Sequence, residues 1–145
     1  MLFLLVLSFG YFSGLDMVKK TTDYKVDGIQ ENILGNEFNE ESEALHFKMS
    51  ERELHGIIHS HVITLSMLFI LLQFLIYFTS IPNPIKVFLM IEPMLSLLLT
   101  FGGLWMLWNG ALWMKYVIMI SGICMHLSMV AFILILIYEL SLKKA

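Results

Sequence analysis

Long apolar stretches alternate with short polar breaks along this chain. Residues 57–79, 87–108 and 117–140 are each long enough to cross a bilayer, because a membrane-spanning helix needs about 20 mostly apolar residues. A fourth stretch, residues 2–15, is apolar but shorter, and it reaches spanning length if the helix runs on to Val18. The pattern predicts an all-α protein, an integral membrane bundle of four transmembrane helices.

The first apolar stretch has two interpretations. Residues 1–18 form either a first transmembrane helix or signal anchor, or a signal peptide whose cleavage leaves three spans. The stretch lacks the basic residues that precede the apolar part of a signal peptide, and it has no clear small-residue cleavage site. These features favour a helix that is retained. The missing basic flank also leaves open that the natural N-terminus is longer.

The polar breaks contain residues typical of turns and helix ends. Two prolines in residues 80–84 exclude a continuous helix there, and Asn109-Gly110 predicts the next turn. Ser50 and Glu53 have the spacing of a capping box, so the second long helix is expected to begin near residue 51.

The polar segment ahead of that helix holds shorter signals. Asp27-Gly28 and residues 34–36 predict turns, and residues 38–48 predict one short helix. A segment of this size cannot hold a core of its own, so we expect it to lie on the bundle.

Charged side chains are concentrated in one part of the chain. The 145 residues are 58% hydrophobic and 14% charged, and residues 16–53 hold ten acids and five bases. The net charge of −3, without a basic cluster, argues against nucleic-acid binding, and one cysteine, Cys124, excludes an internal disulfide. We therefore expect a first span over residues 1–18, an acidic extracytoplasmic segment over 19–50, and a three-helix transmembrane bundle over 51–145.

The lysines outside that segment predict the orientation. Lys86, Lys143 and Lys144 fall on one side of the predicted bundle, and the positive-inside rule places that side, with the C-terminus, in the cytoplasm. Lys19 and Lys20 lie on the other side, close to the first span, and weaken this prediction.

Polar residues in the spans share helix faces. In lipid such residues usually face the bundle interior, a cavity or a partner. At 100° per residue, His55 and His59 share a face with Gln73, which predicts that both histidines point inward. Two further sets each share a face: Glu92, Ser96, Thr100 and Gly103 in the third predicted span, and Ser121, Cys124, Ser128 and Glu139 in the last one. Hydrogen-bonded packing between helices explains such faces without further function.

Gln73 and Glu92 are polar intramembrane residues at similar predicted depth. We expect them to hydrogen-bond, beside a local kink where Pro93 frees a backbone carbonyl. Glu92 is either an acid of a proton relay or quinone site, or a packing residue; an intramembrane acid is a functional hypothesis by default.

All five histidines are candidate ligands of a metal or haem. His55 and His59, four residues apart on a helix, can converge on one ion, with His46 folding over as a third metal ligand. Alternatively, His126 pairs with His59 or His61 around a haem b, and Gly122 leaves room for the porphyrin edge. A chain with no prosthetic group fits equally, since interfacial histidines often only hydrogen-bond to water or headgroups.

One arrangement of short motifs resembles a known group of proteins. Gly28-Ile29 and residues 35–37 are followed by Phe47-Lys48, Ser50 and Glu53, and then by the His59-x-His61 pair opening a span. It resembles small, uncharacterised four-helix inner-membrane proteins of bacteria, some of them from respiratory settings. The resemblance implies four spans, an extracytoplasmic first loop and some importance for His59 and His61, whereas the helical-face argument favours His55 and His59.

The leading hypothesis is a small membrane subunit of a respiratory or other redox complex. Its histidine site near the outer face would serve haem b or quinone electron transfer, and no catalytic activity of its own is predicted. The alternatives are a non-catalytic accessory subunit packed on larger membrane partners, or on copies of itself, and an outer-face metal-binding protein. No hydrolase or nucleotide-binding pattern is present.

Overall fold

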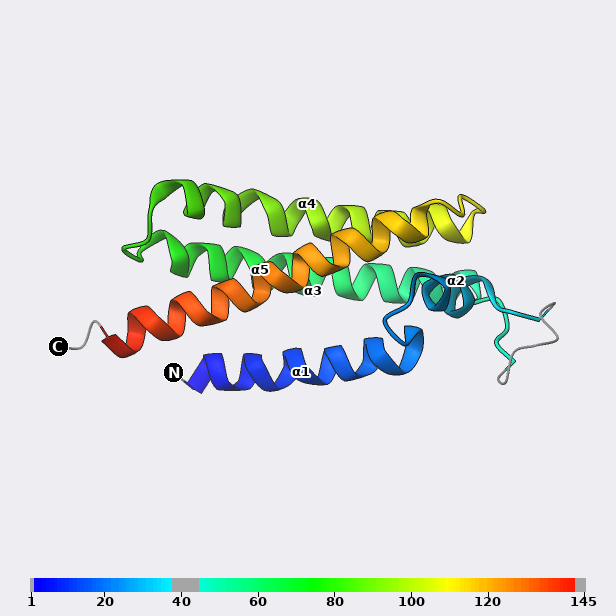
Figure 1. Ribbon diagram of the computed structural model, residues 1–145, viewed down its shortest axis with the longest axis horizontal. Helices are drawn as coiled ribbons and strands as arrows, with labels where there is room; N and C mark the ends of the chain where they lie inside the picture. Colours follow the sequence, from blue (N-terminus) through cyan, green and yellow to red (C-terminus); the bar gives the residue numbers. More distant parts are fainter. Residues whose placement is uncertain (1, 38–44, 143–145) are drawn as a thin grey trace.

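Five helices and no strand make up the part of the chain that the computed structural model describes, residues 2–37 and 45–142. α1 (Leu2–Thr22) precedes the short α2 (Val26–Leu34), and three long helices follow: α3 (Glu51–Tyr77), α4 (Asn83–Trp108) and α5 (Met114–Leu142). The four long helices run lengthwise, with α2 at one end (Figure 1). All four are long and apolar enough to span a membrane, which confirms the predicted all-α bundle of four spanning helices.

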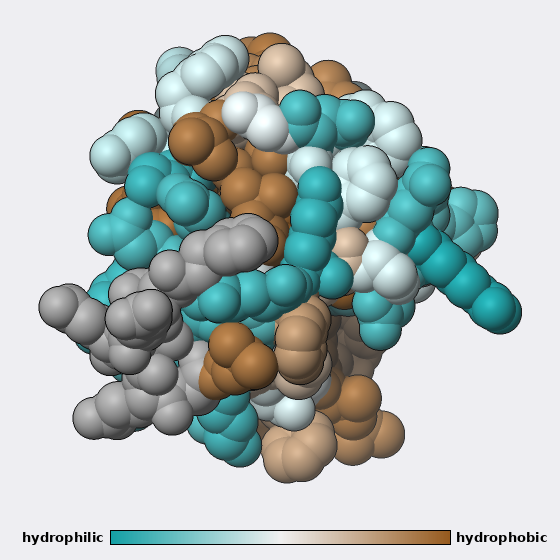
Figure 2. Space-filling view, turned by 90° about the vertical axis from the view of Figure 1, so that its right-hand side faces the viewer, coloured by the Kyte–Doolittle hydropathy of each residue, from teal (hydrophilic) through white to brown (hydrophobic). Residues whose placement is uncertain are grey.

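The two ends of the bundle differ. The N-terminus, the α3–α4 turn and the end of α5 lie at one end, and α2 lies with the α4–α5 turn at the other, which we call the α2 end (Figure 1). Figure 2 looks directly onto the α2 end and shows many hydrophilic side chains on its surface. The described residues of the acidic segment after α1 therefore lie at the end opposite the α3–α4 turn, as the sequence pattern predicts. Which end faces the cytoplasm stays a prediction.

The start of α3 follows the sequence signals, whereas the start of α2 does not. The Ser50 hydroxyl accepts a hydrogen bond from the Glu53 amide, and the Glu53 carboxylate accepts one from the Ser50 amide, so the predicted capping box is confirmed. The turn predicted at Asp27-Gly28 is wrong, because both residues lie in the first turn of α2.

Gly28 has a different role from the predicted one. A Cβ there would lie 2.0 Å from the Thr22 carbonyl oxygen, so glycine permits the close approach of α2 to the end of α1. Gly35, at φ 78°, ends α2 as predicted. Of the helix predicted over residues 38–48, residues 38–44 lie outside the described part, and residues 45–48 are not helical.

Two clusters of buried apolar residues hold the bundle together. The cluster near the α3–α4 turn joins α1, α3, α4 and α5, and its members include Leu4, Phe69, Leu72, Leu89 and Phe132. The cluster at the α2 end fastens α2 to the long helices, and it comprises Ile29, Ile33, Leu54, Leu107, Met114 and Ile118. Lys115 of α5 adds a polar contact to α2, because its Nζ donates a hydrogen bond to the Asp27 carboxylate at 2.8 Å. The sequence pattern did not predict this docking of α2.

The long helices are packed to very different degrees. α4 packs most extensively on α5 and less on α3, and α1 touches the bundle at few points. In the apolar 18-residue stretch of α1 only 6% of the residues are buried, against 39% in the corresponding stretches of α4 and of α5. Most of α1 therefore faces its surroundings, lipid or another protein.

Candidate functional site

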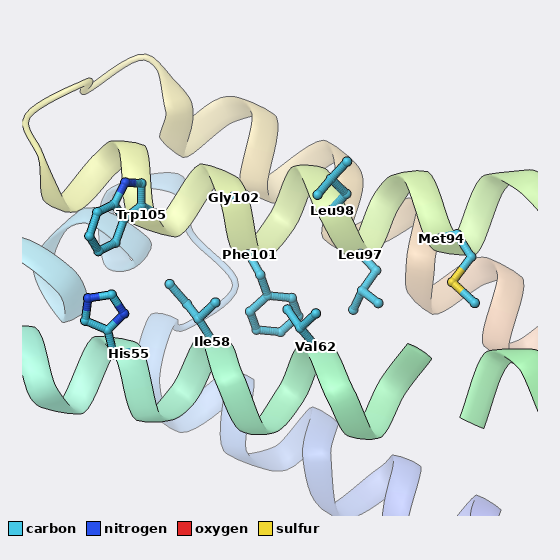
Figure 3. Close-up of a pocket in the computed structure, with 9 residues that line it drawn as sticks. All are labelled: His55, Ile58, Val62, Met94, Leu97, Leu98, Phe101, Gly102 and Trp105. Atoms are coloured by element: carbon cyan, nitrogen blue, oxygen red, sulfur yellow. The ribbon is translucent and has the colours of Figure 1, made fainter. Parts of the chain in front are cut away.

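An apolar groove separates α3 from α4 in the half of the bundle near the α2 end. Its volume is about 620 Å³, within the range of small-molecule sites in proteins. Ile58 and Val62 of α3 and Phe101 of α4 point toward one another across it (Figure 3). The full lining is His55, Ile58, Val62, Met94, Leu97, Leu98, Phe101, Gly102 and Trp105.

His55 and Trp105 form the mouth of this groove. Their ring centroids are 4.8 Å apart with the planes tilted by 50°, and the two rings face each other from α3 and α4 (Figure 3). Nε2 of His55 also lies 3.7 Å from the Glu51 carboxylate, one turn earlier in α3. The mouth thus offers a flat aromatic ring beside an imidazole that can donate a hydrogen bond.

The other two histidines of α3 lie outside the groove lining. The His61 ring stacks on Phe101 at 5.4 Å between centroids, and its Nδ1 lies 2.9 Å from the Ile57 carbonyl oxygen of its own helix. His59 is exposed, and so is His55. The expectation that His55 and His59 point into the interior is wrong: the α3 face that is buried carries Leu54, Phe69, Leu72 and Ile76, because apolar side chains fill the bundle centre more readily than imidazoles.

His126 lies in a different interface from His61. The His126 ring is 5.7 Å from the Tyr11 ring of α1, and the Tyr11 hydroxyl donates to the His126 backbone carbonyl at 3.5 Å. Gly122, one turn earlier, has open space where a Cβ would be. His126 therefore faces α1 while His61 faces α4, and the structure does not bring the two proposed haem ligands onto one interface.

The proposed metal ligands are also apart. His46 pairs with Asn36, whose side-chain oxygen accepts from the His46 amide at 2.7 Å. It lines a polar cavity of about 330 Å³ beside the start of α2, away from the His55–Trp105 pair. Among the described residues no group of three or more His, Cys, Asp or Glu side chains is arranged to hold a metal ion.

The polar cavity at the start of α2 carries charges of both signs. Lys20 and Lys25 lie there with Asp23, Asp27 and others, and Lys25 lies 2.6 Å from the Asp23 carboxylate. This hydrogen bond and the positive charge of Lys25 hold the pKa of Asp23 below its ordinary value. The lysines already have acidic neighbours, so the cavity has the character of a solvated, internally paired surface.

Gln73 hydrogen-bonds to the α4 backbone and not to Glu92. Its Nε2 donates to the Leu89 carbonyl at 3.3 Å and to the Met90 carbonyl at 3.0 Å. Leu89 lies four residues before Pro93, and proline has no amide hydrogen for that carbonyl. The expected freed carbonyl is thus present, and Gln73 from the neighbouring helix supplies its donor.

Glu92 finds its partners across the other side of α4. Ser96 of α4 donates to one carboxylate oxygen, and Ser128 of α5 donates to the other. Both serines are buried, at 5% and 3% exposure. The predicted bond to Gln73 is replaced because Glu92 points toward α5, whereas Gln73 reaches α4 from α3.

The same side of α4 continues as a close seam with α5. The hydroxyls of Thr100 and Ser121 are 2.8 Å apart. At Gly103 a Cβ would meet Ile118 Cγ1 at 2.8 Å, so the backbones approach closely there. This confirms the predicted polar and small face of residues 92–103 as a helix-packing face, together with Ser121 and Ser128 of the facing helix.

The groove lining includes residues that the sequence analysis did not single out. Trp105, Phe101 and Gly102 have the character of ordinary residues in an apolar span, and only the position of α3 beside them makes a groove. The sequence feature that indicated this site was His55, which lies one turn inside the N-terminus of a spanning helix.

Comparisons with known proteins add one finding. A family model described as a transmembrane helical domain matches residues 23–145. This range contains α2 to α5 and leaves out α1. No curated protein and no solved structure matches the chain.

Proposed function

We propose that this chain, which belongs to the Aq_1264_TM family of transmembrane helical domains, is a small multi-pass membrane subunit that binds a quinone in the groove between α3 and α4, for electron transfer within a redox complex. The observation that carries the proposal is the groove of about 620 Å³ with His55 and Trp105 at its mouth. A quinone is a flat ring with two carbonyl acceptors and an apolar tail, and the lining complements each of these parts.

Each element of the groove matches one part of such a ligand. Trp105 offers an aromatic face for ring stacking, the His55 imidazole offers a hydrogen-bond donor for one carbonyl, and Ile58, Val62 and Leu97 offer apolar contacts for the tail. The polar member lies at the membrane boundary end of α3 and the apolar members lie deeper, in the order that an amphiphile entering from the lipid requires.

Fluorescence quenching tests the proposal. A short-chain quinone titrated into a detergent-solubilised Trp108→Phe variant, which lacks the second tryptophan 6.3 Å from the Trp105 ring, should quench Trp105. In this background the saturable quenching should disappear in Trp105→Phe but persist in Trp113→Phe, whose tryptophan lies in the α4–α5 connection. His55→Ala should weaken binding about fivefold, the value of one hydrogen bond, while His59→Ala, which changes an exposed histidine one turn away, should leave it unchanged. Equal quenching in Trp105→Phe would exclude this groove.

The accessory-subunit alternative makes a different prediction for the same groove. An apolar lining also suits a phospholipid acyl chain. If no quinone quenches Trp105 up to saturation, and a phospholipid with a quencher-labelled acyl chain does, the groove holds structural lipid and the chain is an accessory subunit. Elution with larger partners, or as a homo-oligomer, under mild detergent would support the complex in either case; elution as a monomer would contradict it.

Haem b bound by His126 with His59 or His61 stays a prediction. The quinone is preferred because one histidine and one aromatic ring suffice for it, whereas bis-histidine haem needs two imidazoles facing each other. A reduced-minus-oxidised difference spectrum of the purified protein with Soret and α bands would support haem. A spectrum without them removes it.

The orientation is likewise proposed from charge. Placement of residues 19–50 outside the cytoplasm of a bacterial inner membrane, with the α3–α4 turn inside, follows from Lys86, Lys143 and Lys144. Cysteines introduced at the exposed positions Glu37 and Ser80 in a Cys124→Ser background should react with an impermeant thiol reagent from opposite sides. Labelling of Ser80→Cys from the periplasm would reverse the orientation.

A further inference from the structure

Glu92 is a carboxyl group inside a membrane-spanning helix. It is the tenth residue of α4, about 14 Å along the axis from Asn83 at 1.5 Å per residue, and the helix as a whole extends about 39 Å at the same rise. Its depth is therefore well within the apolar part of the span. Acidic groups at such depth are costly and need a compensating positive charge or a proton.

The surroundings of Glu92 supply hydroxyl donors and no positive charge. Ser96 and Ser128 each donate to a different oxygen of the carboxylate, and none of the ion pairs formed by the described residues involves Glu92. On α3, the Gln73 amide is engaged with the α4 backbone at Leu89 and Met90. On α5, Cys124 lies one turn from Ser128.

The other titratable groups of the packed helices lie elsewhere. His126 faces Tyr11 of α1, and His55 and His61 lie against Trp105 and Phe101 nearer the α2 end. Lys86, six residues before Glu92 in α4, donates to the Tyr77 and Thr79 carbonyls, and Glu139 accepts from the Ser80 amide at the end of the bundle away from α2. Among the described residues, the hydrogen bonds to the Glu92 carboxylate come from Ser96 and Ser128.

We propose that Glu92, Ser96 and Ser128 form an intramembrane proton-binding site at the interface of α4 and α5. Three side-chain residues meet there, whereas hard metal ions take about six or more oxygen ligands, so the donor set is too small for such an ion. A serine hydroxyl can donate to a carboxylate or accept from a carboxylic acid, so both serines can stay bonded to Glu92 whether or not it carries a proton. Glu92 is only partly buried, so a reagent dissolved in the lipid can reach its carboxyl group without separating the helices. The site is independent of the α3–α4 groove, because it lies on the other side of α4.

A hydrophobic carbodiimide tests the site, because such reagents couple to protonated carboxyl groups in apolar surroundings. In proteoliposomes, a fluorescent carbodiimide should label the wild-type protein at acidic pH and progressively less as the pH rises. Glu92→Gln should abolish the label. Glu139→Gln, which changes an acid at the helix end, should retain it.

A second variant keeps the test informative if Glu92→Gln folds poorly. Ser128→Ala removes one hydroxyl that donates to the carboxylate, which disfavours the charged form, so the midpoint of labelling should move up by about one pH unit, the equivalent of one hydrogen bond. Ser66→Ala removes a hydroxyl of α3 that bonds only the Ile63 carbonyl of its own helix, and it should leave the midpoint unchanged.

Three results would overturn the proposal. They are the absence of labelling at every pH, labelling that persists in Glu92→Gln, and labelling that falls at constant pH when choline chloride is replaced by sodium chloride. The last result would make sodium the occupant. An unchanged midpoint in Ser128→Ala would remove Ser128 from the site.

Discussion

The two sides of α4 pack against their neighbours in opposite ways. Toward α5 the helix presents Ser96, Thr100 and Gly103, and the facing backbone comes close enough for hydroxyls 2.8 Å apart to bond. Toward α3 it presents Phe101, Leu97 and Trp105, and a groove remains between the helices (Figure 3). Small polar side chains thus close an interface, while large apolar ones on the same helix hold another apart.

This difference has a physical origin in the membrane. Lipid tails are as apolar as leucine, so apolar side chains gain little by burial between helices, and association rests on close packing and interhelical hydrogen bonds. The α4–α5 seam has both features. Along the groove no hydrogen bond joins the described side chains of α3 to those of α4, and farther along the two helices are drawn together by Gln73. Space for a ligand therefore exists where the strongest associating contacts are missing.

The largest expected effect comes from filling the seam. Gly103→Val places carbon atoms where a Cβ already lies 2.8 Å from Ile118 Cγ1, and overpacking of this kind costs about 2–3 kcal/mol. Its matched control is Gly102→Val, whose Cβ has no atom within 4 Å and whose cost should be small. Thermal unfolding in detergent measures both. Equal losses would show that the two sides of α4 do not differ in tightness.

An intermediate effect is expected at the proline. Gln73→Leu leaves the Leu89 carbonyl without a donor, because Pro93 has no amide hydrogen, and an unsatisfied buried acceptor costs about 1–2 kcal/mol. Pro93→Ala restores the backbone donor, so the same Gln73→Leu change should cost less in that background. The double-mutant cycle, measured by denaturant unfolding in micelles, gives the coupling. Independent, additive costs would contradict the role assigned to Gln73.

The smallest effect concerns one hydroxyl pair in the seam. The Thr100–Ser121 coupling in a cycle of Thr100→Val and Ser121→Ala should be about 0.6 kcal/mol, the average for hydrogen bonds between membrane helices. A parallel cycle of Ile58→Ala and Leu97→Ala, across the groove, should give a coupling near zero. A larger coupling across the groove than across the seam would reverse the comparison.

The parts of the architecture that the sequence predicted are those that depend on local signals. Length and apolarity identify the spans, and the Ser50–Glu53 capping box places the start of α3 at Glu51. The small polar face of residues 92–103 was predicted because helical periodicity alone brings those residues to one side. α2 was missed because Asp27-Gly28 has the composition of a turn, whereas Gly28 serves a close contact with Thr22.

The sequence by itself determined that this is an all-α membrane bundle and which residues share each helix face. Only the tertiary structure decided which face meets which helix: that Glu92 bonds Ser128 and not Gln73, that His61 and His126 lie in different interfaces, and that His55 meets Trp105. The physical reason is that periodicity fixes angles within one helix, whereas rotation and depth between helices depend on the packing of side chains from distant parts of the chain.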